Sequence, residues 1–264
     1  MQGNTILVTG GTSGIGQALA AELLARGNIV LVTGRSEERL AATRATLPGV
    51  HTFLCDQSDL ASIERACGEI VAAFPTLNML INNAGIGLKR NLNNMNAPLA
   101  ELDVEIRTNL IGPLQLIQQL LPQLKRQPRA MIANVTSGLA FVPMPLKPIY
   151  CATKAAMHSY TQSLRVQLAR TNVAVIELVP PATDTDFNKG QEDMNTANLM
   201  SPTTFARAAV GGMEAGKAEV LPGLSRVLRL LWRINPRATL RRRDGEQMGA
   251  TGAPAIKGEN DEQG

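Results

Sequence analysis

Tyr150 and Lys154 are the two residues whose types and spacing most directly suggest chemistry. On a helix, residues four positions apart lie on one face, so the Lys154 ammonium can approach the Tyr150 phenol. A nearby cation favours the phenolate, and we therefore expect Lys154 to lower the pKa of Tyr150 from its usual value of about 10. Such a phenol can act as an acid towards a developing alkoxide and as a base in the reverse direction.

Ser137 is the third member of this set. It follows an apolar run at residues 130–135, which is typical of a buried strand, and it precedes Tyr150 by thirteen positions. A hydroxyl at the end of a strand can donate a hydrogen bond to a substrate oxygen and stabilise the negative charge that develops there. The three residues together predict proton transfer to or from an oxygen atom.

A glycine-rich stretch at residues 9–16 is the element best suited to position a ligand for these groups. The apolar run 5–8 before it predicts a buried strand, and the apolar residues after it recur at helical spacing. Glycines allow a sharp turn and close approach, while the free N–H groups and positive dipole end of the helix attract an anion. A purely steric role for the glycines is the alternative. The layout predicts a dinucleotide pyrophosphate site at Gly10, Thr12, Ser13, Gly14, Ile15 and Gly16.

Strand and helix patterns alternate along the rest of the chain. Further strands are expected at 28–33, 52–55, 77–81, 130–135 and 173–179, with a short one at 219–221. The helix at 59–74 is expected to begin at Asp59 and to bury Leu60, Ile63, Ile70 and Val71. This alternation predicts an α/β fold, with one Rossmann-like domain over residues 1–223 whose doubly wound parallel sheet carries helices on both faces.

Composition limits the class of protein. The 264 residues are 44% hydrophobic and 18% charged, which is ordinary for a soluble globular protein, and no apolar run predicts a spanning helix. The beginning of the chain lacks the pattern of a secretory signal, so a cytoplasmic location is expected. The net charge of +4 comes largely from residues 226–243, and an aromatic content of 3% is too low for a base-stacking surface. Nucleic acid is therefore not an expected partner.

The cysteines and histidines do not form a metal-binding pattern. Cys55, Cys67 and Cys151 make neither a C-x-x-C pair nor zinc-ligand spacing, and the chain has only two histidines. We expect reduced thiols and no metal ion. Cys151, beside the tyrosine, is interpreted as a packing residue, and His158 as a packed or hydrogen-bonded one.

Arg35 follows the strand expected at 28–33. In dinucleotide-binding folds the end of this strand faces the adenosine ribose, where an arginine suits a 2′-phosphate and an acid suits a 2′-hydroxyl. Arg35 therefore favours NADP over NAD. The alternative is a solvated arginine at the start of a helix that Ser36 is expected to cap.

These motifs resemble the short-chain dehydrogenase/reductase family. They are the T-G-x-x-x-G-x-G turn at 9–16, the N-N-A-G sequence at 82–85, and a serine followed by Tyr-x-x-x-Lys at 150–154, within residues 5 to about 185. The sequence C-A-T-K-A-A-M-H-S-Y at 151–160 and the double proline at 180–181 look most like the bacterial DltE-like oxidoreductases. The resemblance implies a nicotinamide-dependent oxidoreductase, for which Arg35 favours NADP(H), and, because members of the family commonly assemble, a homo-oligomer.

The resemblance also implies roles for individual residues. Asn109 would complete a catalytic tetrad with Ser137, Tyr150 and Lys154 by supporting a water that links Lys154 to solvent. The asparagines of N-N-A-G would also brace the central strands. Implied cofactor contacts are Asp56 at the adenine ring, Asn83, Ala84 and Gly85 beside the adenosine ribose, Tyr150 and Lys154 at the nicotinamide ribose, and Pro181 and Thr185 near the carboxamide. Pro181 replaces the glycine usual in the family, so the local loop geometry is expected to differ.

We expect three different structures in the C-terminal part of the chain. Residues 182–201 are expected to form a substrate loop, either a lid or plain surface. Residues 224–243 form a basic amphipathic segment that could lie on an anionic membrane surface, although packing on the domain or on a partner subunit is favoured. Residues 244–264 are expected to be disordered.

The leading functional hypothesis is an NADP(H)-dependent oxidoreductase that transfers a hydride between nicotinamide and a small carbonyl or alcohol substrate, with Tyr150 as the acid or base. The alternative is an NADP(H)-binding sensor or partner-binding protein with little turnover, against which the intact tetrad argues. An epimerase or dehydratase acting on a nucleotide sugar is disfavoured, because little chain remains after Thr185 for a sugar-nucleotide domain.

Overall fold

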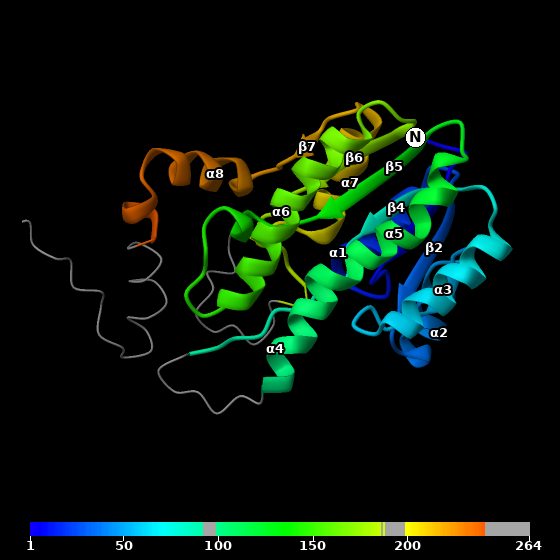
Figure 1. Ribbon diagram of the computed structural model, residues 1–264, viewed down its shortest axis with the longest axis horizontal. Coiled ribbons are helices and arrows are strands. Elements are labelled where there is room, and N and C mark those ends of the chain that lie inside the picture. The colour runs from blue at the N-terminus through cyan, green and yellow to red at the C-terminus, as the bar shows by residue number, and fades with distance from the viewer. Residues whose placement is uncertain (92–98, 186, 188–198, 241–264) are drawn as a thin grey trace, which may run out of the picture.

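The computed structural model describes residues 1–91, 99–185, 187 and 199–240, which fold around a parallel sheet (Figure 1). Seven strands lie in the order β3-β2-β1-β4-β5-β6-β7, and every neighbouring pair is parallel. Their bounds are β1 Thr5–Thr9, β2 Ile29–Gly34, β3 His51–Leu54, β4 Leu77–Asn82, β5 Ala130–Val135, β6 Val173–Leu178 and β7 Glu219–Val220. The predicted doubly wound α/β sheet is confirmed.

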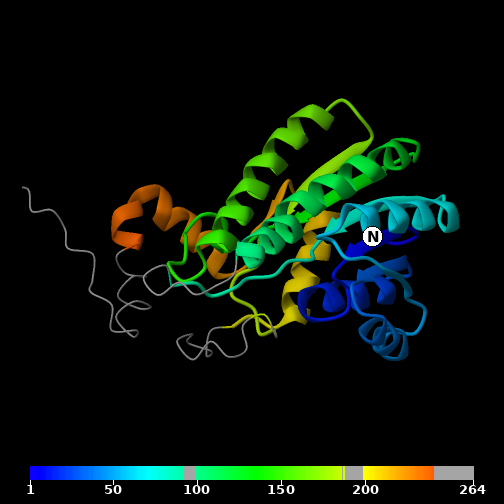
Figure 2. The ribbon, with the colours of Figure 1, turned by 60° about the horizontal axis from the view of Figure 1, so that its bottom comes forward.

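Helices cover both faces of the sheet (Figure 2). Helices α1, α2 and α7 pack on one face, and α3, α5 and α6 pack on the other. The bounds are α1 Gly14–Ala25, α2 Glu37–Thr46, α3 Leu60–Ala73, α4 Leu99–Ile106, α5 Gly112–Lys125, α6 Pro148–Leu168, α7 Pro202–Glu214 and α8 Leu224–Ile234. A π-helical turn, η2 (Arg107–Ile111), joins α4 to α5, and a 3-10 turn, η3 (Gly138–Ala140), follows β5.

The central strands are apolar on both faces because both faces are covered. In β1, Ile6 and Val8 belong to the core under α1 and α7, whereas Leu7 belongs to the core under α3 and α5. All three side chains are fully buried. Burying such a side chain stabilises a fold by about 1.5–3 kcal/mol. This is why uninterrupted apolar runs, rather than alternating ones, indicated the strands.

The order of the strands reverses next to β1. The chain builds β1, β2 and β3 outward to one side and then returns to place β4 on the other side of β1. The carboxyl ends of β1 and β4 therefore lie side by side, with connections leaving in opposite directions. Ligands of open parallel sheets bind at such a switch point. The glycine-rich turn follows β1 and the N-N-A-G segment follows β4, so both lie there.

The helix starts follow the predicted capping, with one error in burial. Ser36 caps α2 and Asp59 caps α3 through their side-chain oxygens. Ile63 and Ile70 are buried as predicted, but Leu60 is 44% exposed. Leu60 is the first residue of α3 and lies beyond the stripe that faces the sheet, so its expected burial is wrong.

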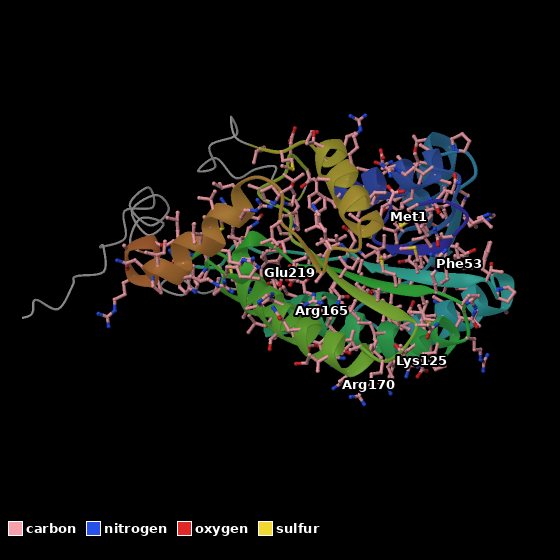
Figure 3. All side chains as sticks on the ribbon, turned by 90° about the horizontal axis from the view of Figure 1, so that it is seen from above. Met1, Phe53, Lys125, Arg165, Arg170 and Glu219 are labelled. Carbon is pink, nitrogen blue, oxygen red and sulfur yellow. The ribbon has the colours of Figure 1, made fainter. Side chains whose placement is uncertain are left out.

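Helix α8 stands away from the sheet and its covering helices (Figure 3). It contacts η3, and Arg229 forms an ion pair with Glu219 of β7. Five large apolar residues of α8 are 43% to 71% exposed: Leu224, Val227, Leu230, Leu231 and Ile234. Packing of the basic segment on the domain is thus confined to one side of the helix. In the part of the chain described, no helix is long and apolar enough to cross a bilayer.

Candidate active site

The glycine-rich turn between β1 and α1 is packed too tightly for side chains. Gly10 and Gly14 have φ angles of 63° and 53°, a region that favours glycine. A Cβ at Gly10 would lie 2.8 Å from the Ala84 Cα, and one at Gly16 would lie 2.3 Å from the Gly10 carbonyl oxygen. Ile15 packs against the core. The turn therefore presents backbone, rather than side chains, at the carboxyl end of β1.

The N-terminus of α1 can offer its N–H groups to an anion. Its N-cap, Ser13, makes no capping hydrogen bond through its side chain, and the first turn carries no acidic residue. Ser36, Asp59 and Ser201, in contrast, cap α2, α3 and α7 through their side chains. The first N–H groups of a helix have no partner within the helix, and its dipole favours negative charge there. This arrangement fits a pyrophosphate group.

Two other segments lie against the turn. A Cβ at Gly34 would lie 2.8 Å from the Thr12 Cγ2, which places the end of β2, followed by the exposed Arg35, beside the turn. A Cβ at Gly14 would lie 3.1 Å from the Thr185 Cγ2, so Thr185 reaches the start of α1. The structure thus brings together predicted residues that follow β1, β2 and β6.

The N-N-A-G segment is fastened to the same turn by hydrogen bonds. Asn83 Nδ2 donates to the Thr9 carbonyl oxygen at 2.9 Å. The Thr9 hydroxyl accepts from the N–H groups of Asn83 and Ala84, each at 3.0 Å. Asn82 Nδ2 donates to Asn134 Oδ1 at 2.9 Å and joins β4 to β5. The prediction that these amides brace the central strands is confirmed.

Asp56 lies two residues beyond β3, and its carboxylate is held locally. Its Oδ1 accepts hydrogen bonds from the N–H and the hydroxyl of Ser58 at 2.9 and 2.7 Å. Its N–H donates to Ser62 Oγ at 3.0 Å, and the side chain is half-buried. These bonds orient the carboxylate, while its contact with an adenine ring stays a prediction.

Tyr150 and Lys154 lie one turn apart on α6 and are 8% and 4% exposed. Lys154 Nζ donates to the Val135 carbonyl oxygen at 2.8 Å and lies 5.7 Å from the centroid of the Tyr150 ring. The Ser137 side chain is close enough to the Tyr150 hydroxyl to act on its pKa. Its Oγ also accepts from the Leu139 N–H at 3.1 Å. The predicted set therefore meets at the carboxyl end of β5.

Burial controls the protonation of both ionisable groups. It raises the pKa of Tyr150, and the hydrogen bond with Ser137 acts in the opposite direction. Burial lowers the pKa of Lys154 to about 8. In the protein by itself, loss of water disfavours the charged form of each group. A lowering of the Tyr150 pKa by Lys154 together with the positive charge of an oxidised nicotinamide stays a prediction.

Asn109 lies in η2, and its amide binds the backbone after N-N-A-G. Its Oδ1 accepts from the Ile86 N–H at 2.8 Å, and its Nδ2 donates to the Ile86 carbonyl oxygen at 2.7 Å and to Thr153 Oγ1 at 3.2 Å. A Cβ at Gly85 would lie 3.2 Å from Asn109 Oδ1 and 3.5 Å from Lys154 Nζ. Asn109 and Lys154 therefore flank Gly85. Asn109 thus lies in a π-helical turn, a feature frequent at functional sites.

The structure adds Phe187 and Lys147 to the surroundings of Tyr150. The ring centroids of Phe187 and Tyr150 lie 5.1 Å apart, and Lys147 Nζ lies 4.2 Å from the Phe187 ring centroid. Sequence reasoning missed both residues because neither belongs to a motif. The position of Lys147, one helical turn before Tyr150, was the available signal.

The double proline begins the loop after β6. The Pro180 carbonyl oxygen accepts from the Gly138 N–H at 3.1 Å, and the Pro181 carbonyl oxygen accepts from Thr183 Oγ1 at 2.9 Å. Positive φ angles in the described residues occur at glycines, so Pro181 does not reproduce a glycine-type turn. Of the expected substrate loop 182–201, residues 186 and 188–198 lie outside the described residues, as do 241–264 of the C-terminal segments.

The three cysteines are free and buried. Burial raises the pKa of Cys55 to about 11 and that of Cys67 to about 12. Cys151 Sγ accepts from the Met144 N–H at 3.2 Å, which agrees with its interpretation as a packing residue. Over the described ranges, no three His, Cys, Asp or Glu side chains are grouped so that they could hold a metal ion.

The half-buried His158 is hydrogen-bonded to the buried Glu177. His158 Nδ1 lies 2.8 Å from Glu177 Oε2, and the Thr136 hydroxyl donates to Glu177 Oε1 at 2.6 Å. The hydrogen bond with Glu177 raises the pKa of His158. His158 was predicted to be packed or hydrogen-bonded, and this is confirmed.

The pair makes stability depend on pH. Because the folded-state pKa of His158 lies above the unfolded value of about 6.5, the stabilisation is complete below that value. It is lost as the pH rises through the folded-state pKa. We expect the free energy of unfolding, measured by denaturant titration, to fall more steeply over this range in the wild type than in His158→Gln. Equal pH dependence in the two proteins would contradict this assignment.

A parallel sheet with a glycine turn that fits an anion at its switch point, beside a buried tyrosine, is typical of dinucleotide-dependent oxidoreductases. The family model described as short chain dehydrogenase matches residues 4–196. The chain belongs to the short-chain dehydrogenase/reductase family, whose members bind a nicotinamide cofactor.

Known relatives agree with this assignment. The oxidoreductase DltE of Bacillus subtilis is 41% identical over 222 residues, which are 83% of this chain and 88% of that protein. A short chain dehydrogenase of Burkholderia cenocepacia in complex with NADP is 26% identical, with a TM-score of 0.80 over 92% of this chain and 98% of that one. The 3-ketoacyl-(acyl-carrier-protein) reductase of Brucella melitensis complexed with NADH is 26% identical, with a TM-score of 0.75 over 83% and 96%. The predicted DltE-like resemblance is confirmed.

Proposed function

We propose that the protein is an NADP(H)-dependent oxidoreductase that interconverts a small carbonyl compound and its alcohol. The observation that carries this proposal is the pairing of the Tyr150 and Ser137 hydroxyls beside the buried Lys154. Two hydroxyls that can reach one substrate oxygen meet the need of carbonyl reduction, which places negative charge on that oxygen. The Brucella relative, named for reduction of a keto group, supports the same reaction type.

Tyr150 would transfer the proton, and Ser137 would hold the substrate oxygen. Since burial raises the pKa of Tyr150, its phenol stays protonated at neutral pH and can donate to an oxygen that gains negative charge. Ser137 Oγ accepts from the Leu139 N–H, and its own proton can be donated to the substrate oxygen when substrate is bound. In the oxidation direction, formation of the Tyr150 phenolate requires positive charge nearby.

Lys154 supplies part of that charge. Its ammonium is anchored on the Val135 carbonyl oxygen and, with a pKa of about 8, is mostly protonated at neutral pH yet able to exchange its proton. The Asn109 amide is committed to Ile86 and Thr153, so Asn109 holds the segment that Lys154 faces. Its support of a water between Lys154 and solvent is part of the proposal.

The switch point fits a dinucleotide. A turn that admits no Cβ at Gly10 or Gly16 and a helix without a side-chain cap suit a pyrophosphate. When bound, the nicotinamide supplies the hydride in reduction and accepts it in oxidation. The residues proposed to hold the cofactor are Gly10, Thr12, Ser13, Gly14, Ile15, Gly16, Arg35, Asp56, Asn83, Ala84, Gly85, Tyr150, Lys154, Pro181 and Thr185.

Arg35 is proposed to select NADP(H) by binding its 2′-phosphate. It is exposed and follows Gly34, which lies against the turn. Hydrogen bonds to charged groups are worth about 1.5–3 kcal/mol, so Arg35→Asp should weaken NADPH binding by about 10- to 100-fold and leave NADH binding unchanged or improved. Fluorescence titration of both cofactors measures this.

Arg170→Asp is the matched control for that prediction. Arg170 is also exposed, but it follows the far end of α6 from Tyr150, and Figure 3 shows it on the outer surface. Its variant should keep the wild-type NADPH affinity. An Arg35→Asp protein that still preferred NADPH over NADH would mean that Arg35 does not bind the 2′-phosphate.

We also propose a cytoplasmic homo-oligomer. The exposed apolar side chains of α8 fit packing against a partner subunit better than an isolated chain. A membrane surface is the less favoured partner of this basic helix. Light scattering should give at least a dimer, and a strictly monomeric protein that sediments with anionic vesicles would reverse this preference.

An NADP(H)-binding sensor is the second candidate function. Both candidates require cofactor binding, but the oxidoreductase also requires turnover. NADPH consumption should be followed at its absorbance band with a panel of aldehydes, ketones and quinones. Consumption with at least one class is the expected result, whereas NADPH binding without turnover across the panel would favour the sensor.

A further inference from the structure

A cluster of buried charges lies one helical turn before Tyr150. Lys147, the N-cap residue of α6, is 2% exposed, Arg90 is 5% exposed and Glu105 is fully buried. The Arg90 N–H donates to the Leu146 carbonyl oxygen at 2.8 Å, which places Arg90 next to the start of α6. We call these three residues, Arg90, Glu105 and Lys147, the Lys147 cluster.

The Phe187 ring connects this cluster to the proposed reaction centre. Lys147 Nζ lies 4.2 Å from the Phe187 ring centroid, and that centroid lies 5.1 Å from the one of Tyr150. A Cβ at Gly87 would lie 2.3 Å from Phe187 Cζ and 3.2 Å from Tyr150 Cδ2. The Phe187 ring therefore lies next to both the Lys147 ammonium and the Tyr150 ring.

The surroundings of Lys147 are unfavourable for a cation. Burial, together with the nearby charge of Lys89, lowers the pKa of Lys147 to about 8, and Glu105 offsets this only in part. The N-terminus of α6, which has no side-chain cap, adds the positive end of a helix dipole. An anion bound beside Lys147 would offset the cost of its burial, the repulsion by Lys89 and the unfavourable end of the α6 dipole.

The buried guanidinium of Arg90 has no hydrogen-bond partner among the described residues. Its Nε, Nη1 and Nη2 atoms donate to no acceptor in the structure as described. Among the described residues, the nearest carboxylate oxygens are Glu105 Oε2, 3.9 Å from Nε, and Glu101 Oε2, 3.6 Å from Nη1, both beyond hydrogen-bond distance. A buried guanidinium with unpaired N–H groups is costly, and it suits bidentate binding of a planar anion such as a carboxylate.

We infer that Lys147 and Arg90 bind an acidic group of the substrate, so that the protein prefers aldehydes or ketones that carry a carboxylate or sulfonate. The inference rests on the proposed carbonyl reduction at Tyr150 and Ser137. Arg90 supplies the paired N–H donors, and Lys147 supplies a point charge on the Tyr150 side of the cluster. Glu105 accepts from the Leu88 N–H at 3.3 Å, and its carboxylate is near enough to Arg90 and Lys147 to offset part of their charge. In this inference it positions the two cations and does not touch the substrate.

The test compares succinic semialdehyde with butanal, its neutral counterpart of equal chain length. Wild-type protein should show a kcat/KM at least about tenfold higher for the acid. Lys147→Met should lower kcat/KM for the acid by about 10- to 100-fold, mainly through KM, because a charged hydrogen bond is lost. The kcat/KM for butanal should change by less than about twofold, because butanal loses no contact in this variant. Lys147→Arg should restore part of the preference.

Lys125→Met is the matched control, since Lys125 is exposed in the last turn of α5 and should affect neither aldehyde. Equal losses for both aldehydes in Lys147→Met, or no preference in the wild type, would overturn the inference and leave Lys147 a structural residue. Melting temperatures of both variants verify that they are folded.

A binding measurement separates failure of this inference from failure of the proposed function. Calorimetric titration of succinate into the NADP-bound protein should show binding that weakens at least about tenfold in Lys147→Met. Lys147-dependent binding without reduction of either aldehyde would retain the acid site and count against the reductase. Reduction of butanal with no succinate binding would retain the reductase and overturn the acid site.

Discussion

Tyr150→Phe is expected to lower kcat/KM by about 10³-fold, in the range that general acid–base catalysis contributes, while NADPH affinity stays close to the wild-type value. The substitution removes the phenol oxygen proposed to transfer the proton. It keeps the ring, which packs 5.1 Å from the Phe187 ring, so the fold around it should persist. Initial rates of NADPH consumption measure the loss, and fluorescence titration measures cofactor affinity.

Tyr160→Phe is the control for this result. Tyr160 is the only other tyrosine of the chain, lies on the same helix and packs against the core beneath α6. Tyr160→Phe also removes a phenol oxygen, but not the one proposed to transfer the proton. Its kcat/KM should therefore stay within about twofold of the wild-type value. Retention of more than a tenth of wild-type activity by Tyr150→Phe would contradict the role of Tyr150 as the proton donor.

Gly16→Ala is expected to weaken NADPH binding by at least about 100-fold, because α1 could no longer hold its N–H groups at the turn. The added Cβ would lie 2.3 Å from the Gly10 carbonyl oxygen and 2.5 Å from Asn83 Nδ2. Both atoms belong to the framework that joins β1 to β4, so neither can move without disturbing it. Overpacking of this kind also costs about 1–3 kcal/mol of stability. Cofactor titration and denaturant unfolding test the two effects separately.

Gly68→Ala provides the matched control for the glycine turn. Gly68 lies within α3, where an added Cβ would meet no atom within 4 Å. Replacing such a helical glycine by alanine should stabilise the protein by about 0.5–1 kcal/mol and leave NADPH affinity unchanged. Wild-type NADPH affinity in a folded Gly16→Ala protein would show that this turn does not hold the cofactor.

The sheet and its switch point could be predicted because their signals are local. Strands covered on both faces are mostly apolar, as in Thr5–Thr9. In the helices between them, apolar residues recur with a period of about 3.6 residues. The burial of Leu60 was mispredicted, because periodicity does not show which end residues of a helix lie beyond the surface it packs on. The proposed site residues lie at the carboxyl ends of strands, where the topology alone brings them together.

The electrostatics of the site could not be predicted from spacing. Tyr150 and Lys154 do share a helix face, but their spacing carries no information on how much water reaches them. Both are almost fully buried, and in the protein by itself this burial raises the pKa of Tyr150. The Lys147 cluster was missed for a related reason. Arg90 and Lys147 are distant in sequence, and charged residues in a sequence are normally read as solvated.

Deuterium transfer tests the central claim most directly. NADPH that carries deuterium at the transferable C4 position is incubated with the protein and a carbonyl panel that includes acid-bearing aldehydes, and the products are examined by mass spectrometry. We expect deuterium on the carbinol carbon of at least one product with wild-type protein and with Tyr160→Phe, and almost none with Tyr150→Phe. NADPH that binds but transfers no deuterium to any member of the panel, or equal transfer by Tyr150→Phe, would contradict the account.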